Sequence, residues 1–397
     1  MSTRRNRVAL AGIIFVILLA QVLLYPGIDT LVVVFGGAET LSASMWFLAA
    51  EFAAFVAFAG LWGAVSDATG RRVPFIVAGT VGGFVGYGLL GLLPTLGVAT
   101  FGAAVALRVF QGAATIGAFS LAITMLMDLE GGHGRNMGAA GIAIGGGTAL
   151  GAPLGGQLYE LGPLVPVYIA SGLLLVVALV AAVVLEDSET STRREGVSGA
   201  IVRIRQTPLL LVPYAFGFID RLTAGFFALV GTLYFREVFE LDPGTTGLML
   251  ALFFAPFALL QYPFGVVSDR IGRTIPIVVG STLYGVAVVG VGVAPSVRAA
   301  ALAMILVGVI GAMMAPATMA LVTDLAPSSD RGVAMAGFNA FGSVGFLAGI
   351  LVGGAVADRF GYVSAFVVAG GVEIALAVLV LPVVFRVDRF ETPHPRW

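Results

Sequence analysis

Long apolar runs, bounded by short polar or arginine-containing segments, follow one another along almost the whole chain. A helix that crosses a bilayer needs about 20 apolar residues, because each residue advances about 1.5 Å. We expect spans over residues 8–35, 43–66, 73–93, 97–127, 135–158, 163–185, 208–235, 243–267, 274–294, 298–324, 332–356 and 362–385. The pattern therefore predicts an all-α membrane protein with 12 transmembrane helices.

One connection is longer and more polar than the others. It covers residues 186–207, and it follows the sixth predicted span. The remaining connections are short, so helices that are neighbours in sequence should be antiparallel neighbours in space. We therefore expect a six-helix bundle at 1–185, a cytosolic linker at 186–207, and a second six-helix bundle with a short tail at 208–397.

The arginines indicate which side of the membrane each loop faces. All 21 basic residues are arginine. The loops that would be outside contain Arg236, Arg298 and Arg359, whereas the tails and the other loops contain nearly all the rest. Arginine accumulates on the cytosolic side of membrane proteins. We expect a multi-pass protein of the cytoplasmic membrane with both termini in the cytosol.

Composition supports the membrane class and excludes several others. The chain is 59% hydrophobic and 11% charged, against about 25% charged in soluble domains. It has no cysteine and 2 histidines, so thiolate catalysis is excluded and we expect no metal site. The net charge of −1 gives no reason to expect a nucleic-acid partner. No phosphate-binding loop or protease motif occurs, so we expect neither an enzyme nor a bound cofactor.

A short motif occurs twice, at matching places in the two halves. Residues 63–72 read GAVSDATGRR and residues 265–273 read GVVSDRIGR, and each is followed by a proline. The first glycine would let a helix end pack closely, the aspartate can accept hydrogen bonds at a helix N-terminus, and the second glycine permits a tight turn. A further repeat places Asp128 and Asp324 at the ends of the fourth and tenth spans. The chain is therefore predicted to be a duplication.

Six plus six helices with this paired loop resemble the major facilitator superfamily of secondary transporters. The resemblance covers nearly the whole chain. It implies two bundles that rock about a central site near the middle of the bilayer. It also implies a cytosolic gate in which Asp67 and Asp269 bind opposing helix ends, made of Gly63, Asp67, Gly70, Arg71, Arg72, Gly265, Asp269, Gly272 and Arg273.

Ionisable residues within predicted spans are candidates for function, because burying a charge in a membrane costs at least about 2.5–3.5 kcal/mol. Our proton-coupling candidates are Glu51, Arg108, Asp220, Arg221 and Asp29. Asp220 and Arg221 are adjacent and should point about 100° apart on a helix, so each should find its partner on another helix. Glu373 is a further buried acid, for which a packing partner and a functional role both stay open.

Arg108, Gln111 and Gly112 look like the Arg-x-x-Gln-Gly pattern of proton-coupled members of that family. A fixed cation favours the charged form of a nearby carboxylate, while burial favours the neutral form. We expect Glu51 or Asp220 to be that carboxylate, with Arg108 beside it. The alternative is a static buried ion pair that fixes the packing of the helices.

The fifth predicted span is rich in glycine at regular spacing. It looks like the antiporter motif of exporters in the family, except that Ala152 stands at the proline position and the proline follows one residue later. Such glycines let helices approach closely. The motif residues are Gly138, Gly147, Gly151, Pro153, Gly155 and Gly156.

Polar residues within spans could contact a substrate, although each could equally form a hydrogen bond between helices. The candidates are Gln21, Gln111, Thr115, Tyr214, Thr223, Gln261 and Asn339. Together these features predict a monomeric transporter that exports a small, rather apolar organic compound in exchange for protons. One alternative is an importer or facilitator of a sugar, amino acid or organic anion, in which Arg108 and Arg221 would contact the anion. The other is an intramembrane enzyme or a non-transporting sensor.

Overall fold

The computed structural model describes residues 2–130, 133–187, 204–327 and 330–391, and every regular element within these ranges is helical. The predicted linker at 186–207, with Arg193, Arg194 and Arg203, lies largely outside the described residues. The end of the predicted tail after residue 391 also lies outside them.

The first half consists of α1 (Ser2–Val22), the turn η1 (Tyr25–Gly27), α2 (Ile28–Val34), α3 (Leu41–Thr69), α4 (Val73–Thr95), α5 (Phe101–Asp128), α6 (His133–Leu161) and α7 (Val165–Val184). The second half consists of η2 (Pro208–Leu210), α9 (Leu211–Phe226), the π-helical turn η3 (Phe227–Gly231), α10 (Thr232–Glu237), α11 (Pro243–Ile271), α12 (Thr274–Gly292), α13 (Val297–Leu325), α14 (Arg331–Phe360) and α15 (Tyr362–Glu391). The predicted first span corresponds to α1, η1 and α2 together, and the seventh to η2 through α10.

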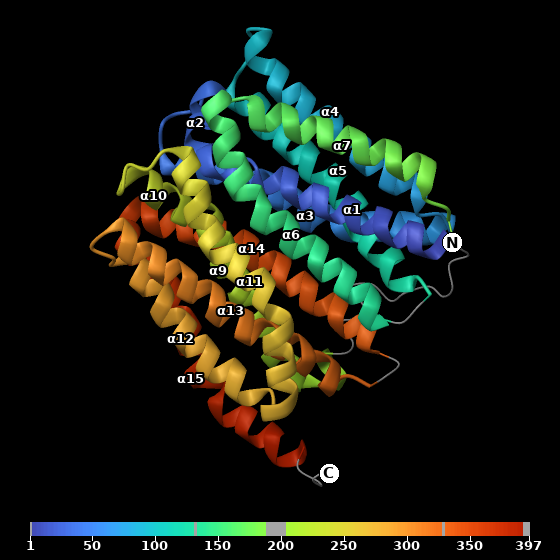
Figure 1. Cartoon of the computed structure of the whole chain (residues 1–397), viewed down its shortest axis with the longest axis vertical. Helices are drawn as coiled ribbons and strands as arrows, with labels where there is room; N and C mark the ends of the chain where they lie inside the picture. The colour runs from blue at the N-terminus through green and yellow to red at the C-terminus, as the bar shows by residue number, and fades with distance from the viewer. Residues whose placement is uncertain (1, 131–132, 188–203, 328–329, 392–397) are drawn as a thin grey trace.

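The predicted all-α membrane fold is confirmed. Eleven segments of the described chain are long and apolar enough to cross a membrane. The predicted fifth span, α6, is not among them, although its 29 residues are long enough. Its many glycines contribute almost no hydropathy. Because α6 packs along both α1 and α11 (Figure 1), it needs little apolar surface of its own.

Local sequence accounts for where several helices begin and end. Thr40, Thr100 and Ser296 each accept a hydrogen bond from the backbone N–H three residues later, which satisfies a free donor at the helix N-terminus. Gly70 and Gly272 end α3 and α11 with φ of +68° and +87°, a backbone region that glycine adopts without strain. Both second glycines thus adopt the positive φ that the predicted tight connection between the helices requires.

Helix packing follows the same order in both halves. The pairs α3–α5, α4–α7 and α1–α6 of the first half correspond to α11–α13, α12–α15 and α9–α14 of the second. Between the halves, the principal contacts join α6 to α11 and α3 to α14. Figure 1 shows the two halves side by side, with α6 and α14 along their boundary.

The contact between α6 and α11 closes one side of the molecule only. A Cβ on Gly156 would lie 2.4 Å from the Pro243 carbonyl oxygen, and one on Gly145 would lie 2.9 Å from Ala258 Cβ, so the antiparallel helices touch there. Continuing toward the side predicted to be cytosolic, Gly138 has no atom near its Cβ position and Tyr262 is 83% exposed. The halves therefore meet on the predicted outer side and separate toward the predicted cytosolic side.

Candidate functional site

The centre of the first half contains a completely buried ion pair. Glu51 of α3 and Arg108 of α5 both have no exposed side-chain surface, and Arg108 Nη2 donates a hydrogen bond to Glu51 Oε2. Two unpaired charges would be far too costly at this depth. Their pairing allows both ionisable groups to be buried inside the helix bundle. Of the carboxylates that the sequence left open, Glu51 is the one beside Arg108.

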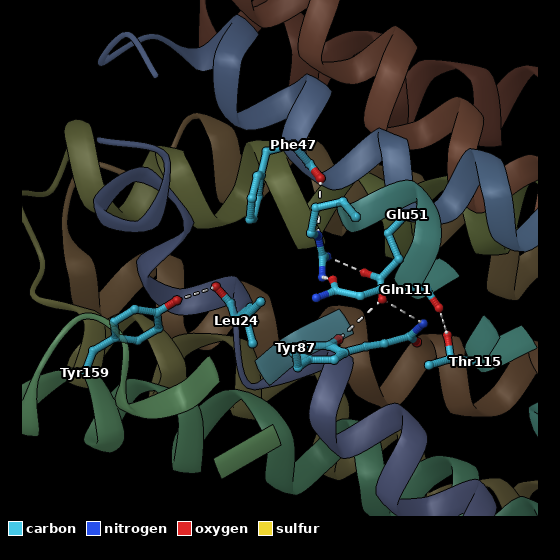
Figure 2. Close-up of polar contacts among 9 residues, drawn as sticks. Leu24, Phe47, Glu51, Tyr87, Gln111, Thr115 and Tyr159 are labelled. Atoms are coloured by element: carbon cyan, nitrogen blue, oxygen red, sulfur yellow. Dashed lines mark hydrogen bonds and ion pairs between the residues drawn. The ribbon is translucent and has the colours of Figure 1, made fainter. Parts of the chain in front are cut away.

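The remaining polar atoms of the pair are nearly all satisfied. Gln21 Nε2 and Tyr87 Oη donate to Glu51 Oε1 at 3.4 and 3.3 Å. Arg108 Nη1 donates to Gln111 Oε1 at 2.8 Å, and Arg108 also lies over the rings of Phe47 and Tyr87. Figure 2 shows Phe47, Glu51, Tyr87 and Gln111 converging on this point. Each of the three guanidinium nitrogens thus has a partner among the described residues, and the group has no exposed surface for an external ligand.

The second half contains the same packing without the charges. A Cβ on Gly112 would lie 2.0 Å from the Glu51 carbonyl oxygen, and one on Gly308 would lie 2.4 Å from the Phe253 carbonyl oxygen. Phe253 therefore corresponds to Glu51. Met304, four residues before Gly308, corresponds to Arg108, and both counterparts are buried. The fold forms with apolar residues at this crossing, so the ion pair is not a requirement of the helix packing.

The ion pair lies directly behind the boundary between the halves. Phe52, the residue after Glu51, packs against Phe346 of α14 with ring centroids 4.4 Å apart. The stretch of α3 that carries the carboxylate is therefore also part of the contact with the second half. Any movement of one half against the other must displace or strain this stretch.

Asp220 and Arg221 lie in the second half, away from Arg108. The prediction that each finds a partner on another helix is wrong, because Arg221 Nε lies 3.9 Å from Asp220 Oδ2. The two side chains bend toward each other despite their angular separation. Asp220 is buried whereas the Arg221 side chain is 46% exposed, so Arg221 is available to an anion and Arg108 is not.

Asp29 of α2 lies near the predicted outer end of the first half and forms an ion pair with a residue of the second half. Arg236 of α10 donates to Asp29 Oδ2 from Nη2 at 2.9 Å and from Nε at 3.0 Å, and to the Leu241 carbonyl oxygen at 2.7 Å. Arg236 was predicted only as an outer-loop arginine, because nothing in the sequence links residues 207 positions apart. The pair joins the halves on the side where α6 and α11 also touch.

We expect Asp29→Asn to loosen the outer contact modestly. Partly exposed ion pairs contribute about 0.2–1 kcal/mol, which corresponds to a change of at most about fivefold in a population ratio. Spin labels at Val98→Cys and Val293→Cys, an outer pair in a chain without cysteine, would report the change as a shift toward longer distances.

Glu237→Gln is the matched control for Asp29→Asn, because Glu237 accepts from Tyr362 within the second half alone. An unchanged distance distribution in Asp29→Asn would show that the ion pair does not help to hold the halves together.

The duplicated loops bind within their own halves. Arg72 pairs with Asp128 at 2.6 Å, and the corresponding Arg273 pairs with Asp324 at 3.1 Å and with Asp269 at 2.5 Å. Asp67 is exposed and makes no hydrogen bond or ion pair with the described residues. The predicted contact of Asp67 and Asp269 with opposing helix ends is therefore not formed in this structure, whose halves are apart on that side. Nothing packs against Gly63, so its predicted close approach is wrong; Gly265 has only an ordinary contact with Pro316.

Arg71 is mostly exposed and lies 3.6 Å from Asp187, whose carboxylate accepts from the backbone N–H groups of Arg72 and Val73 at the start of α4. The helix N-terminus in this loop is thus bound by a carboxylate of the same half rather than by one from the opposite half.

The glycines of α6 serve two different contacts. A Cβ on Gly147, Gly151 or Gly155 would lie within 2.2–2.6 Å of atoms of α1 or of Leu23, the residue that follows it, so these three bring α6 against α1. Gly156 instead faces α11 across the boundary, whereas Gly138 has open space around it. Pro153 lies within α6 without ending it. The predicted close helix approach is present, and a role of this motif in antiport stays a prediction.

The substrate candidates separate into distinct environments. Gln21 and Gln111 belong to the ion-pair cluster, and the hydroxyls of Thr115 and Tyr214 donate to the carbonyl oxygens of Gln111 and Ala334. Thr223 is buried with no partner for its hydroxyl among the described residues, and Asn339 is exposed. Sequence reasoning missed Phe47 and Tyr87 at the cluster, because aromatic residues occur in most of the predicted spans and do not single out these two.

Comparison with known proteins identifies the architecture. The family model described as Major Facilitator Superfamily matches residues 10–235 and 214–396. An MFS-type transporter of Methanocaldococcus jannaschii is 30% identical over 41% of this chain, and the class G tetracycline resistance protein of Vibrio anguillarum is 31% identical over 60%. These matches span 42% and 60% of the relatives' own lengths. The multidrug efflux pump LfrA of Mycolicibacterium smegmatis is 33% identical over 35% of this chain and 27% of its own.

Solved structures agree on the fold. A crystal structure of the nucleoside transporter NupG superposes with a TM-score of 0.76, covering 95% of this chain and 99% of that one, at 13% sequence identity. At this identity the likeness concerns the arrangement of the helices alone.

Proposed function

This chain belongs to the major facilitator superfamily of membrane transporters, and from that premise we propose that it exports a small, apolar organic compound in exchange for protons. The observation that supports this most is the buried Glu51–Arg108 pair, which the second half replaces by Phe253 and Met304. A charged pair that the packing does not require is best explained by chemistry that needs a titratable group.

In the proposed mechanism, Glu51 alternates between a charged form bound to Arg108 and a protonated form. Arg108 favours the charged form, and exclusion of water favours the protonated form. Because Phe52 packs against Phe346 of the other half, the two forms of Glu51 can favour different positions of the halves. The structure, closed outside and open toward the predicted cytosolic side, then corresponds to the state that receives the compound.

Export is supported by the names of two relatives, which describe tetracycline resistance and multidrug efflux. The glycine pattern of α6 agrees with that direction. The alternative is uptake of an organic anion, which the exposed Arg221 favours. Arg108 does not favour it, because its side chain is completely buried and paired with Glu51. Flux measured in everted vesicles separates the two, since an exporter accumulates its substrate inside them.

The function is tested in proteoliposomes with an imposed pH gradient and a panel of apolar compounds that includes tetracycline. We expect at least one compound to move against the proton flow, and a protonophore to abolish its movement. Glu51→Gln should reduce this gradient-driven transport to background, because glutamine cannot bind a proton in exchange. Exchange of labelled for unlabelled compound should persist.

Met304→Leu, at the counterpart of Arg108 in the second half, is the control and should transport normally. Full gradient-driven transport by Glu51→Gln would exclude Glu51 as the proton carrier.

A further inference from the structure

A second buried acid lies in the C-terminal half, outside the proposed mechanism. Glu373 of α15 has no exposed surface; the Ser281 hydroxyl of α12 donates to its Oε1. Its Oε2 has no hydrogen-bond partner among the described residues, and neither has the hydroxyl of the buried Tyr284, one turn from Ser281. Both open groups are fully buried, so water does not satisfy them at the surface.

Close packing of α12 and α15 sets this geometry. A Cβ on Gly285 would lie 2.4 Å from the Gly370 carbonyl oxygen and 3.3 Å from Glu373 Cβ, so the two helices cross in contact at these glycines. Ser281 and Glu373 lie about one turn from the crossing on their respective helices. The acid is therefore held at a tight interface near the middle of the spans rather than on a lipid-facing side.

The charges around Glu373 do not neutralise it. The membrane-spanning parts of α12, α13 and α14 contain no Asp, Glu, Arg or His, and Glu373 is the one charged residue of α15 between Tyr362 and Phe385. The negative charge of Asp220 on α9 acts on both Glu373 and Tyr284. Arg221, the cation of that helix, lies against Asp220 and extends to the exposed side.

The first half shows that the fold does not need this acid. A Cβ on Gly79 would lie 3.0 Å from Ala118 Cβ, and one on Gly280 would lie 3.1 Å from Met314 Cβ. The two glycines therefore correspond, and so do the residues that follow them, Thr80 and Ser281. The Thr80 hydroxyl donates to the Ile76 carbonyl oxygen of its own helix. In addition, α7 contains no charged residue. The Thr80 hydroxyl thus bonds to its own helix backbone, whereas the corresponding Ser281 hydroxyl bonds to the Glu373 carboxyl group.

We propose that Glu373, with Ser281, Tyr284 and Asp220, forms a second proton-binding site in which Glu373 carries the proton. A buried carboxyl group that has no cation as a partner and is exposed to the charge of a second acid is stable only in its neutral form. A protonated Oε2 is itself a donor, so Glu373 then no longer needs a donor from a neighbouring residue at this oxygen. On release, the O–H bond of Glu373 breaks and the proton passes to the Asp220 carboxylate, which leads toward the exposed Arg221.

Infrared difference spectroscopy of the full chain in lipid nanodiscs, at neutral pH without substrate or gradient, tests this site. We expect the wild type to show the C=O stretching band of a protonated carboxylic acid that Glu373→Gln lacks completely. Glu51→Gln should retain this band. Because the measurement needs no transport, it can succeed or fail independently of the proposed function.

Loss of a carboxylate band in Glu373→Gln, instead of an acid band, would overturn the proposal. If Glu373→Gln does not fold, Ser281→Ala tests whether Glu373 is protonated. Removing the donor to Oε1 must shift the frequency of the Glu373 acid band. An unshifted acid region in Ser281→Ala would likewise overturn the proposal, whereas Thr80→Ala is expected to leave the spectrum unchanged.

Discussion

Arg108→Met is expected to destabilise the protein severely and to abolish transport. The substitution leaves the Glu51 carboxylate in the helix interior without its cation, and removing one partner of a buried ion pair costs about 3–5 kcal/mol. That is a large part of the roughly 5–15 kcal/mol that holds a folded domain together. Thermal unfolding in detergent, followed by helix content, should show a markedly lower midpoint than the wild type.

The double variant Glu51→Gln with Arg108→Met is expected to regain most of that stability while remaining inactive. The introduced glutamine side chain would keep polar contacts with Gln21 and Tyr87, and methionine is the residue that the second half uses at the same crossing, as Met304. Replacing a buried pair by neutral groups of similar volume is often neutral or stabilising. If the double variant were no more stable than Arg108→Met, the charge would not be the cause of the loss.

The second large effect is expected from Gly156→Leu, which should force the outer contact open. A Cβ at this position would lie 2.4 Å from the Pro243 carbonyl oxygen, whereas attractive contacts have an optimum near about 3.5 Å. The helices α6 and α11 must therefore separate by about 1 Å for the Cβ alone and by more for the leucine. A bias of about 1.4 kcal/mol is enough to change the population ratio of two states tenfold.

Two pairs of spin labels distinguish rocking from local disorder in Gly156→Leu. The outer pair, Val98→Cys with Val293→Cys, should move apart. The inner pair, Thr69→Cys with Ile271→Cys, should move closer together if the halves rock as rigid bodies. We expect transport to fall at least about tenfold, because the inward-open state is depopulated.

Gly172→Leu serves as the control for Gly156→Leu, since no atom lies near the Cβ position of Gly172; its distances should match those of the wild type. Unchanged distances in both pairs of Gly156→Leu would mean that this glycine contact does not determine which side is closed.

Helices and their boundaries could be predicted closely from the sequence, because the length of an apolar run reports directly on whether a segment can cross a bilayer. The duplicated loop and the paired Asp128 and Asp324 indicated the repeat for a similar reason: they are local patterns that recur. Glu51 and Arg108 could also be selected from the sequence, because burying a charge in a membrane span is costly whichever way the side chain points.

Partners could not be predicted. Asp220 was as good a candidate as Glu51 for the partner of Arg108, and the bond of Asp29 to Arg236 joins residues from different halves. Asp220 and Arg221 were expected to point apart, yet their flexible side chains meet at the edge of ion-pair distance. The gate loops were expected to reach across to the other half, and instead Arg72 and Arg273 bind aspartates of their own halves.

The sequence by itself determined that this protein is a duplicated membrane bundle with costly charges in its spans, because transfer of each segment into lipid depends on its own composition. The tertiary structure alone decided which charges meet, that the predicted outer side is closed, and that Glu373 is buried against Ser281 rather than against a cation. Those outcomes depend on how each helix is rotated about its axis and on which helix it packs against. The free energy of transferring each residue into lipid, on which the sequence prediction was based, carries no information about either.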